Sequence, residues 1–169
     1  VQQLSRELFA GEVNSDRAKV VAEYQGVLEL EGNAARGLEV FKMKCAVCHQ
    51  VGEVGHRIAP NLSSVQNKSE ADLLLAVLDP NREAQPNFNV YTVVTGEGRV
   101  LNGIITAETA NSITLLRAES KRDVVLRSNI DELLSTGLSL MPEGLEKELK
   151  RQQLADVIAF IKSIKPPAK

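Results

Sequence analysis

The sequence has few of the residues that carry redox or metal chemistry. Its 169 residues include two cysteines, two histidines, two methionines and no tryptophan, and aromatic residues make up 4% of the chain. Cys45 and Cys48 are three positions apart, so they cannot form a structural disulfide that closes a long loop. Because the candidates are so few, each of them can be considered individually.

The chain also lacks a strong charge of one sign and a long apolar run. Its net charge is −2, so no basic surface suggests binding to nucleic acid or to an anionic membrane. No apolar stretch approaches the ~20 residues that span a bilayer, and we therefore expect no transmembrane segment. The N-terminus shows no signal-peptide pattern and does not begin with methionine, which suggests a processed protein or a piece of a longer one.

Apolar periodicity predicts helices towards both ends of the chain and strands between them. We expect Asn33 and Ser69 to cap two of the helices, and Asp79-Pro80 to end one. The predicted helices are 16–30, 34–45, 69–78 and 149–165. Segments rich in β-branched residues predict strands at 88–94, 99–106, 112–118 and 122–128, with a fifth at 129–135.

These patterns predict a mainly α fold with one inserted β segment. A hairpin-rich insertion between two helices is topologically simple, because the ends of hairpins can lie close together. We expect this insertion to form a small antiparallel sheet, or a barrel of the SH3 or Sm type. The predicted divisions are a helical extension or linker at 1–31, a main domain at 32–165 with the insertion at about 87–131, and a polar tail at 166–169.

The stretch Cys45-Ala-Val-Cys48-His49 is a C-x-x-C-H motif, which is typical of c-type haem attachment. Two cysteines at this spacing can bond to two vinyl groups on one edge of a porphyrin, while the histidine binds the iron. A redox dithiol normally follows a strand, whereas this motif follows a predicted helix. A zinc site could combine the motif with His56, but adjacent Cys48 and His49 hinder tetrahedral closure. We therefore favour one covalently bound haem c.

An iron bound by His49 needs a second axial ligand or an open site. Met43 precedes Cys45 on the incoming helix and cannot reach the opposite face of the ring. Met141 lies in a loop with glycine and proline just before the last helix, and a thioether held there would suit iron. Filling of core space is the alternative role for Met141. We expect His56 to be a loop histidine, solvated or near a haem edge.

Three residues after the motif have expected roles in the same site. The Pro60 carbonyl could accept a hydrogen bond from the second ring nitrogen of His49, unless Pro60 only shapes a turn. Arg57 could pair with a haem propionate or be an ordinary exposed arginine. Leu62, with other apolar side chains, is expected to exclude water from the ring.

Taken in chain order, these motifs resemble class I cytochromes c. The resemblance extends over most of the chain and includes both predicted terminal helices. The matching features are Gly37 and Phe41 on the predicted helix 34–45, the motif at 45–49, Pro60–Leu62, a helix at 69–78, Met141-Pro142, and Phe160 on the last helix.

This resemblance implies a cytochrome c-like helical fold around one haem. Gly37 would allow close contact with Phe160 where the helix at 34–45 crosses the last helix. The Pro60 carbonyl would orient His49, and Met141 would be the sixth ligand of the iron. The sequence departs from the family where Ala59 replaces a frequent glycine, and where the β insertion lengthens the separation of the two iron ligands.

The phrases "GLSLMPEGLEK", "LDPNRE" and "GRVLNGIITAET" resemble a narrower group of haem-binding domains, found at the C-terminal end of large secreted chains. This implies an electron-transfer domain rather than an enzyme, in the periplasm or another extracytoplasmic compartment. Its partner would be a redox protein or an upstream dehydrogenase domain. The alternatives are an open iron site that binds small ligands or reduces peroxide, and a zinc or interaction module without haem. The β insertion could cover the haem or dock an electron donor.

Overall fold

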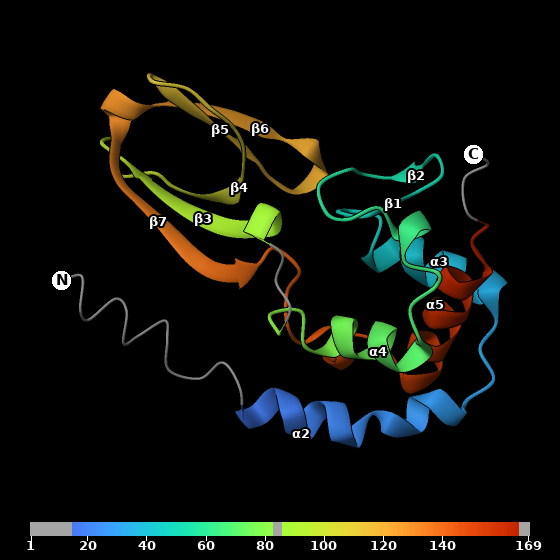
Figure 1. Ribbon diagram of the computed structural model, residues 1–169. Helices are drawn as coiled ribbons and strands as arrows, with labels where there is room; N and C mark the ends of the chain where they lie inside the picture. The colour runs from blue at the N-terminus through green and yellow to red at the C-terminus, as the bar shows by residue number, and fades with distance from the viewer. Residues whose placement is uncertain (1–14, 83–85, 166–169) are drawn as a thin grey trace.

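The computed structural model describes residues 15–82 and 86–165, and it shows a mixed fold of helices and strands rather than the mainly α fold predicted. The helical part consists of α2 (Ser15–Glu23), α3 (Ala34–Lys44), α4 (Glu70–Leu78) and α5 (Arg151–Ser163). A β module at residues 89–139 stands beside it (Figure 1). None of the helices within the described residues is both long and apolar enough to cross a bilayer.

The helices begin where local capping chemistry predicts. The Asn33 side chain accepts a hydrogen bond from the Arg36 N–H at the start of α3, and Ser69 forms a reciprocal capping box with Asp72 at the start of α4. The helix predicted at 16–30 is interrupted, because α2 ends at Glu23 and a 3-10 helix follows at Gln25–Glu29. Gly26 in that segment disfavours a continuous α-helix.

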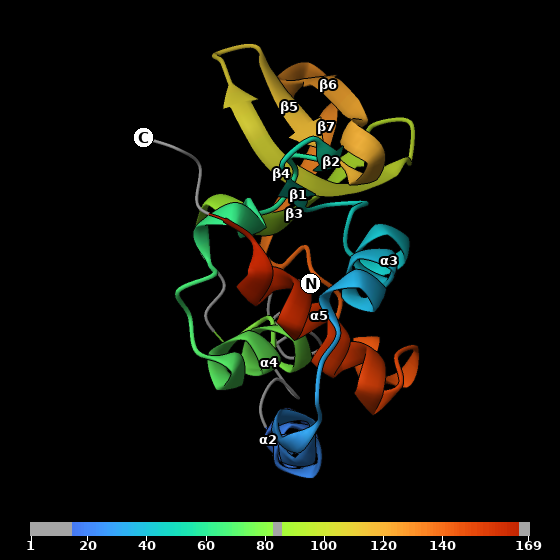
Figure 2. The same ribbon diagram turned by 90° about the vertical axis from the view of Figure 1, so that its right-hand side faces the viewer.

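Helices α3 and α5 lie side by side (Figure 2) and cross at Gly37. A Cβ atom at Gly37 would lie 1.9 Å from the Asp156 carbonyl oxygen, so only glycine fits at this crossing. Next to it, the rings of Phe41 and Phe160 have centroids 5.4 Å apart. The predicted crossing of the first and last helices is therefore present.

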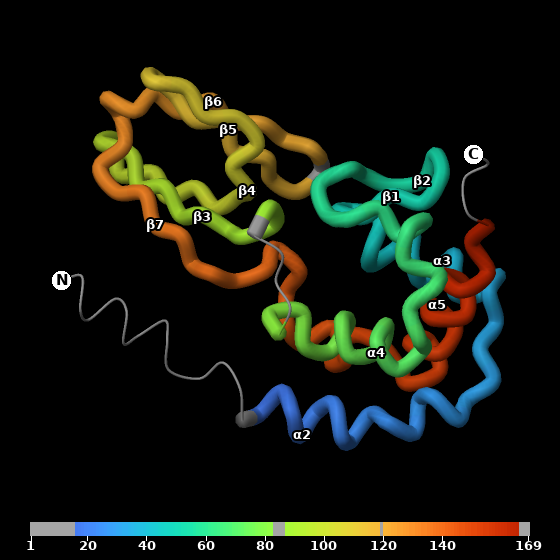
Figure 3. Tube along the Cα trace, in the orientation of Figure 1, coloured from blue at the N-terminus to red at the C-terminus, as the bar shows by residue number. Residues whose placement is uncertain are grey.

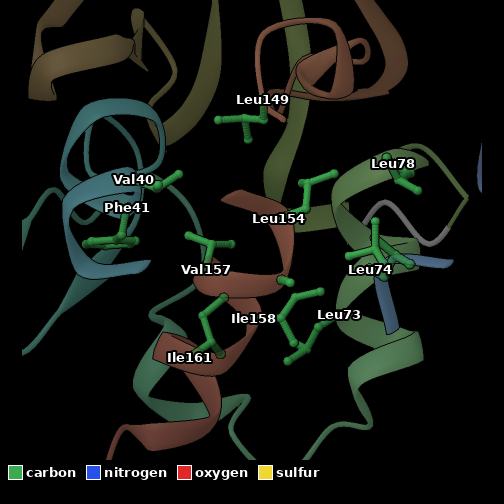
Figure 4. Packing of buried hydrophobic residues seen from close by; sticks show 12 residues of the cluster. Val40, Phe41, Leu73, Leu74, Leu78, Leu149, Leu154, Val157, Ile158 and Ile161 are labelled. Atoms are coloured by element: carbon green, nitrogen blue, oxygen red, sulfur yellow. The ribbon is translucent and has the colours of Figure 1, made fainter. Parts of the chain in front are cut away.

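The helical core is built around α5. Figure 4 shows its apolar side chains between those of α3 on one side and those of α4 on the other. Full burial of each such side chain contributes about 1.5–3 kcal/mol. The labelled residues are Val40, Phe41, Leu73, Leu74, Leu78, Leu149, Leu154, Val157, Ile158 and Ile161. Val20 and Val21 of α2, and Tyr24 just after it, pack on the same cluster, so this core also includes residues that precede position 31.

The β module is one five-stranded antiparallel sheet with the order β6-β5-β4-β3-β7. Four consecutive strands form a meander, and the last strand returns to pair with the first. Side chains from β3, β4, β5 and β6 are buried in a second core, on which residues of β7 also pack. The strands are β3 (Asn89–Thr95), β4 (Val100–Glu108), β5 (Ser112–Leu116), β6 (Arg122–Leu126) and β7 (Ile130–Ser139).

The module is longer than the predicted insertion at about 87–131, because β7 continues to Ser139. Gly137, with a φ of 68°, and its polar neighbours make this stretch look like a turn, yet it extends the pairing with β3. The first residue of the module, Asn89, is paired with its last residue, Ser139. The module's two ends are therefore adjacent, as the tube in Figure 3 shows, and it can be inserted without separating the helices.

Candidate functional site

The C-x-x-C-H motif forms a tight turn at the C-terminal end of α3. Cys45 caps the helix, and its N–H donates to the Phe41 carbonyl at 2.8 Å. The N–H groups of Cys48 and His49 then donate to the Cys45 carbonyl at 3.1 and 2.9 Å. Cys45, Cys48 and His49 are all half-buried, and both cysteines are free thiols. The helix end thus fixes all three side chains in one short turn.

The following residues fold back on this turn through a small hairpin, β1 (Gln50–Val51) and β2 (Val54–Gly55), within the stretch predicted to be a loop. The N–H groups of Ile58 and Ala59 both donate to the Cys48 carbonyl, at 3.1 and 2.9 Å. Gly55 has a φ of 93°, and a Cβ atom there would lie 2.1 Å from the His49 carbonyl oxygen. The hairpin therefore needs glycine at its closest approach to the motif.

His49 is held by the carbonyl that the sequence predicts. Its Nδ1 lies 2.7 Å from the Pro60 carbonyl oxygen. A carbonyl can only accept, so Nδ1 carries the proton and Nε2 keeps its lone pair for a metal. Burial lowers the pKa of His49, and the hydrogen bond to Pro60 opposes this effect. Burial thus favours the neutral form of the ring, and the contact with Pro60 fixes its orientation.

The two cysteines face different parts of the molecule. Cys45 packs on the helical core, whereas Cys48 packs on a separate cluster at the seam with the β module. Burial, with a smaller contribution from the neighbouring Cys48, raises the pKa of Cys45 to about 11. Burial also raises the pKa of Cys48. Reactive dithiols have lowered pKa values, so the environment does not favour the dithiol alternative.

The seam is an apolar cluster that sequence reasoning did not predict, and we call it the junction cluster. Its buried members are Ile58 from the motif loop and Ile104 and Leu116 from the β module. The partly buried members are Cys48, Phe88 and Leu140. These contacts join residues far apart in the chain, and the members other than Cys48 are ordinary core aliphatic or aromatic residues. No local pattern could have identified them.

A polar contact also joins the motif loop to the β module. His56 Nδ1 lies 3.2 Å from the Ser120 hydroxyl oxygen, in the connection between β5 and β6. The backbone N–H of His56 donates to the Ala46 and His49 carbonyls. His56 is therefore an exposed loop histidine bound to the β module.

The remaining predicted site residues lie in the segment that follows the motif and in the loop between β7 and α5. Met141 is half-buried just after β7, where its N–H donates to the Ser139 hydroxyl at 3.1 Å, and the adjacent Leu140 packs in the junction cluster with Cys48. Leu62, like Cys45, packs on the helical core. Arg57 is exposed, and its Nε donates to the Gln50 side chain. The Arg57 side chain is therefore bound to the β1–β2 hairpin that precedes it.

The zinc alternative receives no support from the side-chain geometry. Across residues 15–82 and 86–165, no three His, Cys, Asp or Glu side chains are grouped closely enough to hold a metal ion. Cys45, Cys48, His49 and His56, the proposed zinc ligands, all belong to these residues.

Comparisons with known proteins identify the segment around the motif. Residues 34–93 match the family model described as Cytochrome c. Over 63 residues, the chain is 36% identical to a protein named "Cytochrome c-553-like" from Synechocystis sp. (strain ATCC 27184 / PCC 6803 / Kazusa), a match that covers 37% of this chain and 59% of that protein. The family match includes α3, the motif, Pro60 and α4, whereas Met141 and α5 lie beyond it.

Proposed function

We propose that this chain, whose residues 34–93 match the Cytochrome c family model, carries one covalently bound haem c and transfers single electrons. The observation that carries this proposal is the 2.7 Å contact between His49 Nδ1 and the Pro60 carbonyl, at the end of a turn that also holds both cysteines. An oriented neutral imidazole beside two half-buried thiols is a donor set that fits haem c.

Cys45 and Cys48 would hold the haem through thioether bonds, and His49 Nε2 would bind its iron. A thioether sulfur carries no titratable proton, so burial of these sulfurs suits the attached state. When bound, the haem supplies an iron centre that gains or loses one electron. The hydrogen bond to Pro60 raises the basicity of His49 and fixes its ring orientation.

Met141 is the proposed second axial ligand. Its loop follows β7 directly, its N–H is bound by Ser139, and its neighbour Leu140 packs against the same cluster as Cys48. Together with His49, the Met141 thioether would favour the reduced iron and raise its reduction potential. Two protein ligands on the iron would suit electron transfer better than ligand binding.

The β module is proposed to be a cover for the haem. Ile104 and Leu116 meet Ile58 in the junction cluster, and apolar atoms there would exclude water next to Cys48. Leu62 would exclude water on the side of Cys45. Pairing of Arg57 with a propionate would require Arg57 to exchange its hydrogen bond with Gln50.

The setting of this electron transfer is also a proposal. We place the protein in the periplasm or another extracytoplasmic compartment, with a redox protein or a dehydrogenase domain of the same full-length chain as its partner. This rests on the resemblance of the sequence to haem-binding domains of large secreted chains.

The test is an absorption spectrum of protein matured where haem c attachment operates, with a denaturing gel stained for haem. We expect covalent haem, a low-spin reduced spectrum, and the weak long-wavelength band of an iron–thioether bond in the oxidised form. Met141→Ala should remove this band, whereas the matched control Met43→Ala, at a side chain 65% exposed on α3, should keep it.

Each other outcome points to a different function. A high-spin spectrum in the unaltered protein would favour an open site that binds small ligands or reduces peroxide. Absence of covalent haem despite competent maturation would contradict both haem functions.

A further inference from the structure

The loop that carries Met141 is fixed at both ends by side chains from other segments. We propose that Arg17 and Asn81, here called the clasp, are positioning residues that hold this loop so that Met141 stays on the iron. The inference rests on the proposed function, because it requires Met141 to be an iron ligand.

The first half of the clasp is a buried ion pair. Arg17 of α2 donates from Nη1 and Nη2 to the two carboxylate oxygens of Glu146, at 2.9 and 3.0 Å. Its Nε donates to the Leu78 carbonyl at 2.8 Å. Arg17 is 8% exposed and Glu146 is 5% exposed. A forked pair that is this buried fixes direction as well as distance, and loss of one partner leaves a buried charge uncompensated.

Glu146 stands in a 3-10 helix, Leu145–Lys147, which follows the Met141 loop. The Tyr24 hydroxyl of the N-terminal segment donates to the Glu146 carbonyl at 3.3 Å. The carboxylate and the backbone at this position are thus both bound by residues that precede α3. The pair raises the pKa of Arg17 and lowers that of Glu146, so both stay charged.

The second half of the clasp is Asn81, just after Asp79-Pro80 at the end of α4. Its side-chain oxygen accepts from the Ser139 N–H at 2.8 Å, and its side-chain amide donates to Glu143 at 2.6 Å. The Ser139 hydroxyl in turn accepts from the Met141 N–H at 3.1 Å. Two hydrogen bonds, one to the backbone and one to the side chain of Ser139, therefore link Asn81 to the backbone of the proposed ligand.

Both halves meet the loop from the C-terminal end of α4, where the Leu78 carbonyl binds Arg17 and Asn81 reaches Ser139. Met141 lies between the two anchored ends. A loop held in its ligating geometry gives up little conformational freedom when its side chain binds, so a competing ligand gains less by displacing it. The clasp thus gives a role to the "LDPN" and "LMPEGLE" stretches of the sequence.

The experiment is titration of the oxidised holoprotein with imidazole, which competes with Met141 for iron. In Asn81→Ala and Arg17→Ala we expect imidazole to bind at least about tenfold tighter than in the unaltered protein, a difference of about 1.4 kcal/mol. The iron–thioether band should weaken in parallel. Arg17→Lys keeps the charge but not the fork, so it should fall between Arg17→Ala and the unaltered protein.

The matched control is Arg36→Ala, which removes an arginine–carboxylate pair with Asp156 at the crossing of α3 and α5. It should lower the free energy of unfolding but leave the imidazole affinity within about twofold of the unaltered value. A purely structural ion pair at Arg17 would make Arg17→Ala behave like this control. Asn81 is half-buried and uncharged, so Asn81→Ala should fold and keeps the test decisive.

The outcomes separate the clasp from the function on which it rests. If the unaltered protein shows the thioether band but both clasp variants bind imidazole as it does, the clasp is wrong and the proposed function stands. If the unaltered protein shows no thioether band, Met141 is not the ligand, and both the clasp and the proposed ligation by Met141 are overturned.

Discussion

The helical part and the β module are stabilised in different ways. In the helical part, backbones touch at the crossing of α3 and α5, where Gly37 leaves no space for a side chain. In the β module, side chains of five strands gather in a core of their own. The two parts meet at the junction cluster, and Cys45 packs on one part while Cys48 packs on the seam. The candidate site therefore belongs to the boundary between them, and damage to each part should have different consequences.

The largest effect is expected at the helix crossing. Gly37→Val would place side-chain atoms against the Asp156 backbone, within 1.9 Å of its carbonyl oxygen, and force α3 and α5 apart. We expect the free energy of unfolding to fall by more than about 4 kcal/mol, and little or no haem-loaded protein to form. Urea unfolding followed by circular dichroism measures this.

The control for this change is Gly26→Ala. Among the described residues, no heavy atom lies within 4 Å of a Cβ built at Gly26, so the free energy of unfolding should change by less than about 1 kcal/mol. Equal stability of Gly37→Val and the unaltered protein would contradict the crossing described here.

The next effect separates the two cores. Leu115 on β5 is 0% exposed, and Leu115→Ala should cost about 2–5 kcal/mol. Because the β module has its own core, hydrogen exchange should accelerate mainly at residues 89–139, while α3 and α5 stay protected. Leu154 in α5 is also 0% exposed. Leu154→Ala should accelerate exchange mainly in α3 and α5, while residues 89–139 stay protected. Uniform loss of protection in either variant would show that the parts unfold as one unit.

A smaller, pH-dependent effect is expected at Asp156 in the helical part. Its carboxylate accepts from Arg36 at 2.7 Å and from the Asn33 N–H at 2.8 Å. Asp156→Asn should cost about 1–3 kcal/mol at pH 7, the range for hydrogen bonds to a charged group and for its unsatisfied partners.

The sign of the pH dependence follows from the same contacts. Hydrogen bonding from Arg36, opposed by burial, lowers the pKa of Asp156 from its ordinary value of 3.8. Its stabilising contribution is therefore present above that value and is lost as the pH falls through the lower folded pKa. The stability difference between Asp156→Asn and the unaltered protein should shrink below about pH 4. A difference that stays constant or grows in acid would contradict this assignment.

The smallest change in stability is expected at the seam. Ile104→Val removes one methylene from the junction cluster and should cost about 0.5–1.5 kcal/mol. If the β module covers the haem, admission of water there should lower the reduction potential, because water favours the more highly charged iron. Val124→Thr, at a side chain 67% exposed on β6, should leave the potential unchanged. A redox titration in which the two variants behave alike would exclude the covering role.

Features set by neighbouring residues could be predicted from the sequence. The caps at Asn33 and Ser69 act within three residues, and so their helices were placed correctly. The C-x-x-C-H motif and its nearby carbonyl at Pro60 are similarly local. The sequence predicts the first four strands of the β module because β-branched residues dominate them. The prediction for β7 ends too early, because Gly137 gives the end of this strand the composition of a turn.

Features that join distant residues could not be predicted. The residues next to Arg17 in the sequence are those expected around an exposed arginine. Arg17 is buried because the fold brings Glu146 into contact with it. Ile58 and Ile104 likewise give no separate signal of their contact in the junction cluster. Apolar periodicity shows that a residue is buried, but it does not identify the residues that bury it.

The most direct test of the proposed haem ligation is a proton NMR spectrum of the reduced holoprotein. A methionine bound to low-spin iron has side-chain resonances shifted far upfield by the ring current of the haem. Ligation by Met141 predicts one such set of resonances, retained in Met43→Ala and absent in Met141→Ala. Their absence from the unaltered protein, or their persistence in Met141→Ala, would contradict ligation by Met141.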